Sequence, residues 1–250
     1  MALARTVRVG AASAHPFGTG AYTPAGQPFT PATGSILVAA VEVGFTSTAG
    51  TWDPTIADDN GDGGTWTQRA SVSAAGGWTS GIRVWTRPVV TGASMSVSFD
   101  QGAVDVGGGY AVSIIEYNGQ DSGTPQFGAT AKTAAAVDGA DSVTLTATPA
   151  LGDHALGFLG REMNTGTATS TEGATFTELQ DFTTSAGSGM QSEVRTASTS
   201  TTVDWADLNT AGGDVFRVHL ATIGITVGIV APAAPTIFFQ AGVRLLRPAS

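Results

Sequence analysis

The sequence contains no cysteine and little charge. The absence of cysteine excludes disulfide bridges, zinc sites with thiolate ligands and cysteine nucleophiles. Charged residues make up 12% of the chain, against roughly 25% in ordinary soluble domains. The net charge is −9, and the sequence has no basic stripe that could neutralise phosphates. Nucleic acid is therefore not expected as a partner.

Long hydrophobic runs are also missing. The most apolar stretch, residues 220–231, ends before Pro232 and is shorter than the roughly 20 residues of a membrane-spanning helix. The N-terminal region has no unbroken apolar core of about 7 to 15 residues, which a secretion signal requires. We therefore expect neither a membrane span nor a secretion signal.

The residues that are present form the pattern of an all-β protein. Hydrophobic residues make up 42% of the chain, and 34 glycines supply turn positions. About a dozen apolar or alternating runs, such as residues 35–45 and 110–117, recur at intervals of roughly 8 to 12 residues. No window shows an apolar stripe at helical spacing with capping residues. This pattern indicates a β-sandwich or barrel.

Four segments recur in the same order along the chain, at an offset that falls from 118 to 106 residues. The pairs are GSILVAAV (34–41) with GDHALGFL (152–159), GGTWTQR (63–69) with GATFTEL (173–179), SGIRVWTR (80–87) with SGMQSEVR (188–195), and SVSF (96–99) with TVDW (202–205). We interpret them as two similar strand sets of about five strands each.

The two strand sets are expected at about residues 32–135 and 140–228. A set of five strands on its own would leave open edges and an open face, so we expect the sets to pack together. The predicted fold is one antiparallel jelly-roll-like β-sandwich over residues 32–228. Two separate small sandwiches are the alternative.

The flanking segments are predicted to be extended arms. Residues 1–31 form a Pro- and Gly-rich N-terminal arm, and residues 229–250 form a C-terminal arm with one apolar strand. Apolar segments on a compact domain often dock on a neighbour. The expected assembly contacts are Phe17, Tyr22, Phe29, Ile237, Phe238, Phe239, Leu245 and Leu246.

The stretch DDNGDGGTWTQ (58–68) suggests either a metal site or a turn. Asp58, Asn60 and Asp62 alternate as the first ligands of a calcium-binding EF-hand loop do, but the twelfth position is Arg69 instead of glutamate, and helical flanks are missing. The NG and DG dipeptides favour a hairpin turn. We expect a hairpin without metal and keep those three residues as a minor candidate for an oxygen-ligand site. No cofactor is expected.

Candidate catalytic groups are few. His15, His154 and His219 have no hydrolase or zinc-protease motif around them. Glu42 and Glu116 lie in predicted strands and could face a cleft, as the paired carboxylates of sandwich glycosidases do. The simpler interpretation is that each pairs with an arginine. An enzyme is therefore not expected.

Aromatic residues offer a second type of site. Trp66 and Trp85 alternate with polar residues in strands and are expected in the core. Trp52 in GTWDPT and Trp78 in AGGWTSG lie in predicted loops, where an exposed ring could stack on a surface glycan. They are the candidates for contact with a surface glycan.

The order of several motifs carries a resemblance to a known family. It consists of the Gly-Ser pair and apolar strand at 34–43, the acidic Gly-rich turn with Thr-Trp-Thr at 58–67, Arg-Val-Trp at 83–85, Ser-Val-Ser-Phe at 96–99 and IIEYNGQDSGTP at 114–125. Over about residues 32–228 this order resembles jelly-roll virion proteins of tailed bacteriophages, in particular the minor tail proteins of phages infecting actinobacteria.

The resemblance implies a non-enzymatic structural protein of a virion, in the tail rather than the capsid. Such a minor tail or tail-tip protein would assemble through its arms with copies of itself and other virion proteins, as a symmetric homo-oligomer. It would meet a host cell-surface glycan with the loops of one end. Release by host lysis would explain the missing secretion signal. The alternatives are a capsid decoration or head-fibre protein and a bacterial carbohydrate-binding β-sandwich module.

Overall fold

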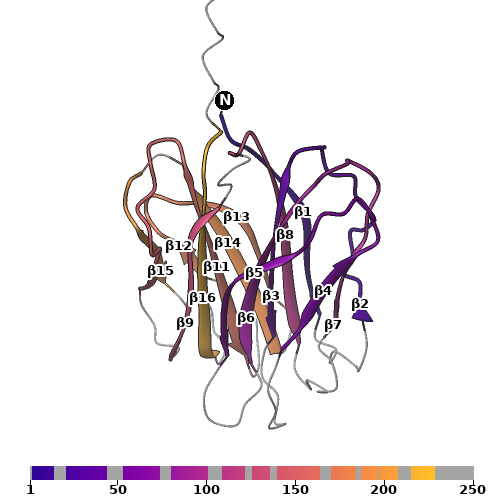
Figure 1. The fold of residues 1–250 in the computed structure, drawn as a ribbon. Helices are drawn as coiled ribbons and strands as arrows, with labels where there is room; N and C mark the ends of the chain where they lie inside the picture. Colours follow the sequence, from indigo (N-terminus) through magenta and orange to yellow (C-terminus); the bar gives the residue numbers. More distant parts are fainter. Residues whose placement is uncertain are drawn as a thin grey trace, which may run out of the picture.

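The fold is all-β, as predicted. The computed structural model describes residues 2–13, 21–43, 53–73, 80–100, 109–121, 126–135, 140–163, 170–183, 187–196, 198–207 and 215–228. Every regular element in these ranges is a β-strand, and the strands form four antiparallel sheets (Figure 1).

The first half of the chain supplies eight strands. They are β1 (Ala4–Ser13), β2 (Ala21–Tyr22), β3 (Ile36–Val43), β4 (Thr55–Asp58), β5 (Thr67–Ser73), β6 (Gly81–Pro88), β7 (Val97–Asp100) and β8 (Tyr110–Asn118). They form a five-stranded sheet in the order β1-β8-β3-β6-β5 and a three-stranded sheet in the order β2-β7-β4.

The second half repeats this arrangement. Its strands are β9 (Phe127–Ala135), β10 (Asp141–Thr144), β11 (His154–Met163), β12 (Thr171–Glu172), β13 (Thr177–Thr183), β14 (Gly187–Arg195), β15 (Thr202–Asp207) and β16 (Val215–Ile225). Their sheets run in the orders β9-β16-β11-β14-β13 and β10-β15-β12. Each second-half strand thus takes the place of the strand numbered eight lower.

The pairing register confirms the two similar strand sets. Leu37 lies opposite Arg87 in the β3–β6 pair, and Ala155 lies opposite Arg195 in the β11–β14 pair. Ala155 follows Leu37 by 118 residues, and Arg195 follows Arg87 by 108 residues, which are the offsets of the corresponding recurring segments. The recurring segments therefore occupy equivalent strands.

Four sheets stack into four layers with three apolar cores between them. The first core lies between the first half's two sheets and includes Trp85 and Phe99, and the second core, in the second half, includes Leu159 and Trp205. The central core joins the halves, because it contains Ile82 and Ile115 from the first and residues such as Phe158 from the second. The five-stranded sheets form the middle of the body (Figure 1).

The packing of set against set is confirmed, but the layers are more numerous than expected. Each set has eight strands rather than about five and forms a two-layer sandwich with its own core. Short strands such as β2, β4 and β12 have too few residues to show an alternating pattern in the sequence. Missing them led to the prediction of one sandwich.

Two predicted boundaries were wrong. Residues 4–13, assigned to an N-terminal arm, form β1 at the edge of the first five-stranded sheet, where they pair with β8. Residues 127–135, assigned to the first set, form β9 and pair with β16 of the second set. The segment that follows Gly228 lies outside the described residues.

The predicted arm contacts Tyr22 and Phe29 belong to the first core. The ring of Tyr22 in β2 lies 4.4 Å from that of Tyr110, measured between centroids. Phe29 exchanges backbone hydrogen bonds of 3.0 and 2.8 Å with Met95 and packs against the same core. Phe17 and the five C-terminal assembly candidates lie outside the described residues.

The two five-stranded sheets meet as the halves of a pseudo-symmetric pair. The edge strands of the first sheet are β1 and β5, and their counterparts in the second sheet are β9 and β13. Across the interface β1 packs against β13 and β5 packs against β9, so the two edges are exchanged. This exchange is what an isologous, two-fold interface produces. Near the pseudo-axis Glu42 of β3 faces Gly160 of β11. Gly160 is the residue that corresponds to Glu42 in the second half, because β11 follows β3 at an offset of 118 residues.

Gly160 leaves the space that the buried Glu42 side chain fills. A Cβ at position 160 would lie 2.2 Å from Glu42 Cγ, and Glu42 is fully buried. Gly160→Ala should therefore lower the free energy of unfolding by about 1–3 kcal/mol through overpacking. In a Glu42→Ala background the same substitution should cost much less, which denaturant unfolding of the four chains measures. Equal costs in both backgrounds would contradict this packing.

The body has two distinct ends. At the terminal end, Gly228 N donates to Gly119 O (2.7 Å), so the last strands of both halves finish together beside the start of β1. At the loop end, Ser80 Oγ donates to Glu162 Oε2 (2.9 Å), which joins the start of β6 to the end of β11. Because the strands are antiparallel, every connection from an odd-numbered strand to the next leaves from the loop end, and Figure 1 shows those strand ends at the bottom.

Candidate functional site

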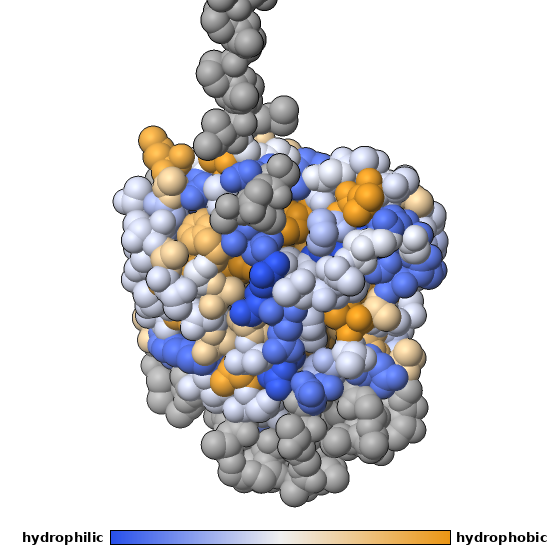
Figure 2. All heavy atoms as spheres, viewed as in Figure 1, coloured by the Kyte–Doolittle hydropathy of each residue, from blue (hydrophilic) through white to orange (hydrophobic). Residues whose placement is uncertain are grey.

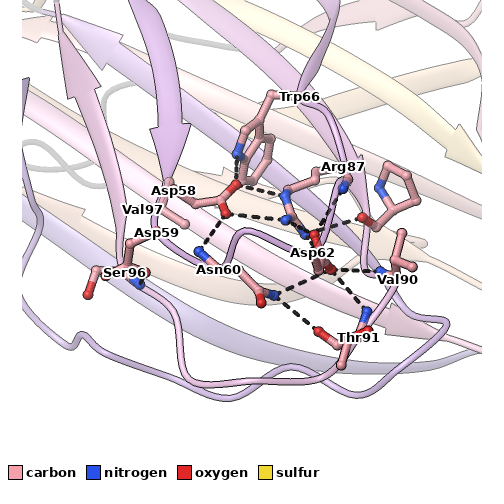
Figure 3. A network of polar contacts seen from close by, with 12 residues as sticks. Asp58, Asp59, Asn60, Asp62, Trp66, Arg87, Val90, Thr91, Ser96 and Val97 are labelled. Atoms are coloured by element: carbon pink, nitrogen blue, oxygen red, sulfur yellow. Dashed lines mark hydrogen bonds and ion pairs between the residues drawn. The ribbon is translucent and has the colours of Figure 1, made fainter.

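The acidic turn of residues 58–66 is organised around one buried arginine from β6 (Figure 3). Arg87 is 1% exposed, and its Nε lies 2.7 Å from Asp58 Oδ2. Its Nη2 donates to Asp58 Oδ1 (3.2 Å) and forms a second ion pair with Asp62 Oδ1. One guanidinium therefore holds the carboxylates of Asp58 and Asp62 in bidentate fashion.

Asp62 links the turn to the segment after β6. Its Oδ2 accepts hydrogen bonds from the backbone N–H of Val90 (2.8 Å) and Thr91 (3.0 Å), and Oδ1 accepts from Gly64 N (2.9 Å). Burial raises the pKa of Asp62, but these backbone bonds and Arg87 outweigh it and lower the pKa to about 2. Asp62 is thus ionised through the ordinary pH range.

Asp58 fixes the tryptophan that follows the turn. Trp66 Nε1 donates to Asp58 Oδ2 (2.7 Å), and Asn60 N donates to Asp58 Oδ1 (3.0 Å). With Arg87, these donors occupy the lone pairs that a cation would need. The three metal candidates Asp58, Asn60 and Asp62 therefore serve as a polar clasp that closes the turn.

The turn is not a hairpin, contrary to the prediction. β4 pairs with β7 in the three-stranded sheet, whereas β5 pairs with β6 in the five-stranded sheet. The chain therefore crosses from one layer to the other between them. Gly61 and Gly63 have φ values of 67° and 82°, so the NG and DG dipeptides do supply the left-handed positions expected of them.

A hollow of about 500 Å³ opens beside this turn. Ile56 and the half-buried Trp66 provide its apolar lining, and Gly61 and Gly63 form part of its rim. Thr65 is exposed on the same rim. Sequence patterns did not indicate this hollow, because it arises where the turn crosses between layers.

The equivalent arginine of the second half has different partners. Arg195 donates to the backbone carbonyls of Thr202 (2.8 Å) and Ser200 (2.5 Å), and its guanidinium lies 4.6 Å from the ring centre of Phe176. Phe176 corresponds to Trp66 in the recurring segments. The arginine and aromatic positions are thus common to both halves, and the clasp is particular to the first.

The second core contains a buried carboxyl group where the first core has a tryptophan. Glu193 lies opposite Gly157 in the β11–β14 pair, as Trp85 lies opposite Ala39 in the β3–β6 pair. Glu193 is fully buried, and Gly173 N donates to its Oε2 (3.3 Å).

The surroundings of Glu193 favour its neutral form. Burial, together with the nearby Asp204 and Glu172, raises its pKa to about 9 against the opposing effects of Gly173 N–H and Arg195. Glu193 is therefore protonated in the folded protein at neutral pH. No sequence motif marked this residue, although the SGIRVWTR and SGMQSEVR match places it at a tryptophan position.

Glu42 and Glu116 do not form a catalytic pair. Glu116 lies on the first-core face of its sheet with Ile114, where its carboxylate accepts from Ala32 N (2.7 Å) and pairs with Arg8. Glu42 lies on the opposite face, toward Gly160, and at the other end of β3. The glycosidase arrangement needs both carboxylates on one face.

Two of the three histidines are buried. Burial lowers the pKa of His154 to about 4, helped by the charge of Arg5, so this imidazole is neutral at pH 7. The Nδ1 of His219 lies 2.9 Å from Thr133 Oγ1, and its Nε2 lies 3.9 Å from Glu162 Oε2. His15 lies outside the described residues.

Of the four candidate tryptophans, two lie in the described part of the chain and two lie outside it. Trp66 and Trp85 contribute to the first core as predicted. Trp52 and Trp78, the predicted glycan contacts, lie outside the described residues. They belong to the connections that follow β3 and β5, which both leave from the loop end.

Apolar side chains are scattered among hydrophilic ones on the face drawn in Figure 2. The large hydrophobic residues that are exposed in the described part of the chain are Val7, Val90 and Leu151. The described residues include no helix that could cross a membrane.

Comparisons of the chain with protein-family models, with curated proteins and with solved structures found no match.

Proposed function

We propose that this chain is a non-enzymatic structural protein of a bacteriophage virion, in the first place a minor tail or tail-tip protein. The observation that carries the proposal is that the two ends of the body differ. The described chain begins and finishes at the terminal end, while all odd-to-even connections leave from the loop end. Such a body can be attached at one end and present loops at the other.

The winding of each half supports the jelly-roll part of the resemblance. A jelly roll has eight strands in two sheets, built from two Greek keys. In each half the first strand lies beside the last, and the third lies between the last and the sixth. The second strand pairs with the seventh, and the seventh with the fourth. This is the order of a long double hairpin wound around one core, except that the fifth strand pairs with the sixth instead of the fourth.

The use of the charged groups supports a structural role. Arg87 holds Asp58 and Asp62, and Arg161 pairs with Asp181 and donates to Ser170 Oγ (2.8 Å). These buried charges bind one another within single halves, so their role is to hold turns and strands in place. The two candidate catalytic carboxylates are kept apart.

Contact with the host is assigned to the loop end. The connections after β3 and β5 contain Trp52 and Trp78, and in the fold they begin on the two strands that flank β6 in the first five-stranded sheet. An aromatic ring near a chain connection can stack on a sugar. The proposed partner there is a host cell-surface glycan, with other virion proteins and copies of this chain at the terminal end.

Binding to cells tests the host-contact role. The fluorescently labelled, purified protein should bind intact actinobacterial cells saturably, and the combined Trp52→Ala and Trp78→Ala substitutions should abolish the binding. A Trp85→Phe variant, changed in the first core, should still bind if it remains folded. Loss of binding with a chelator would implicate a metal ion. Saturable binding that survives removal of both loop tryptophans would contradict the assigned contact.

The capsid alternative predicts a different result. A capsid decoration or head-fibre protein would share the fold and attach to particles, yet show no binding to cells. A bacterial carbohydrate-binding module would bind glycans as a monomer and would be absent from particles. The mass of the protein in solution and its presence in purified particles separate these alternatives from a tail protein.

A further inference from the structure

We propose that the hollow beside the acidic turn is a docking site for the C-terminal segment of a neighbouring copy, which inserts Leu245 and Leu246 between Arg244 and Arg247. This inference rests on the proposed function, in which copies of the chain associate in a particle. It adds the surface through which one copy binds the next, which the sequence resemblance does not provide.

The hollow has the form of a receptor for apolar side chains. Ile56 and Trp66 line it, and Trp66 is held in place from behind by the first core and at its Nε1 by Asp58. A Cβ at Gly61 or Gly63 would meet no atom within 4 Å, so the rim is open above the lining. A volume of about 500 Å³ is sufficient for two leucine side chains.

The polar groups around the hollow favour an apolar occupant over a saccharide. The carboxylate of Asp58 accepts from Trp66, Asn60 and Arg87, and that of Asp62 from backbone N–H groups and Arg87. A sugar needs free donors and acceptors for its hydroxyl groups, and these groups already have protein partners. Apolar side chains need only the lining.

Charge complements the shape. Asp58, Asp59 and Asp62 outnumber Arg87, so the turn carries net negative charge next to the hollow. Residues 229–250 contain two charged residues, both arginines, on a chain whose net charge is −9. These arginines flank the leucine pair in the sequence Arg-Leu-Leu-Arg. An apolar pair between two cations therefore matches an apolar hollow beside an acidic turn.

The C-terminal segment leaves the body at the terminal end, where the hollow also lies. Gly228 lies at the terminal end, bonded to Gly119. The acidic turn lies at the same end, because β5 starts there opposite Thr86 of β6 and Asp62 binds Val90 and Thr91 just after β6. The 22 residues from 229 to 250 span up to about 70 Å when extended, enough to reach an adjacent copy.

Complementation between two defective full-length chains tests the proposal. Thr65→Arg places a bulky cation on the rim of the hollow without altering the clasp. The combined Leu245→Asp and Leu246→Asp substitutions disable the segment. Thr175→Arg, the same substitution at the corresponding exposed position of the second half, is the matched control. Sedimentation velocity measures the mass of each chain and of mixtures.

The wild-type chain and Thr175→Arg should associate as concentration rises, and salt should weaken the association. Thr65→Arg and the double leucine variant should each be monomeric. Their equimolar mixture should form a 1:1 dimer, because one chain retains the segment and the other the hollow. A mixture that stays monomeric would show docking within one chain or none, and association that survives Thr65→Arg would show another interface. Either result would overturn the proposal, whether or not the protein is found in particles.

Discussion

Replacing Arg87 with methionine is expected to lower the free energy of unfolding by about 3–5 kcal/mol, because it leaves two carboxylates without their cation in a largely buried site. The side chains of Asp58 and Asp62 are 7% and 1% exposed, so water can replace the guanidinium only in part. Urea unfolding at neutral pH, followed by tryptophan fluorescence, measures the change. The effect should be concentrated in the first half, whose acidic turn joins its two sheets.

Arg195→Met is the matched control for that substitution. This arginine occupies the same position in the second half but donates to two backbone carbonyls, so its loss should cost about 1–3 kcal/mol. Adding Asp62→Asn to Arg87→Met should restore part of the lost stability, since it removes one unpaired charge. A cost for Arg87→Met of no more than about 1 kcal/mol, as for an exposed ion pair, would contradict the buried clasp.

The second large effect is a dependence of stability on pH that arises from Glu193. Its folded pKa of about 9 lies above the ordinary value of 4.5, so the folded state binds more protons than the unfolded state between these limits. Stability from this group is therefore complete below pH 4.5 and falls as pH rises toward 9. His154, with a folded pKa of about 4, has the opposite slope, but only below its ordinary value of 6.5.

The two slopes oppose each other between pH 4.5 and 6.5, so stability should change little there. Above pH 6.5 Glu193 is the one of these two groups that still changes stability, and its contribution should fall by roughly 3 kcal/mol by pH 9, at up to about 1.4 kcal/mol per pH unit. Glu193→Gln should remove this fall and be more stable than the wild type at pH 9.

Glu178→Gln provides the control for the pH profile. Glu178 is an exposed residue of the neighbouring strand β13, and its replacement should leave the wild-type profile unchanged. Unfolding curves at pH 5, 7 and 9 for the three chains are sufficient. If the wild type were as stable at pH 9 as at pH 7, Glu193 would not be held in its neutral form by the fold.

The sequence contains enough information to predict the all-β class and the duplication. Segments such as SGIRVWTR keep both their order and their alternation in the second half, and these features survive divergence because they bury one face of a strand. The strand number was underestimated because β2 and β12 have two residues each. Such short strands are defined only by their pairing with strands that are distant in the sequence. This pairing leaves no pattern in the neighbouring residues.

The acidic turn shows where local patterns stop being informative. The NG and DG dipeptides correctly place Gly61 and Gly63 at positive φ. Whether the flanking strands pair with each other depends on the winding of the whole half, and here β4 and β5 enter different sheets. The partner of the two aspartates, Arg87, lies 25 residues beyond Asp62 in the sequence and could not be assigned from spacing.

Duplication offers an internal comparison that the sequence alone did not exploit. Positions that differ in character between the halves mark specialised sites: Glu193 stands in place of Trp85, and Gly160 in place of Glu42. The first exchange puts a carboxyl group into an apolar core, and the second relieves a clash at the pseudo-axis. The acidic clasp likewise occurs in one half and has no counterpart in the partners of Arg195.

The measurement that tests the proposed function most directly is the protein composition of purified virions from a phage whose genome encodes this chain. Mass spectrometry of particles purified by density gradient should detect the chain, and a gold-labelled antibody should place it on the tail. Its presence in the lysate but absence from particles that contain phage DNA would contradict a role in the virion.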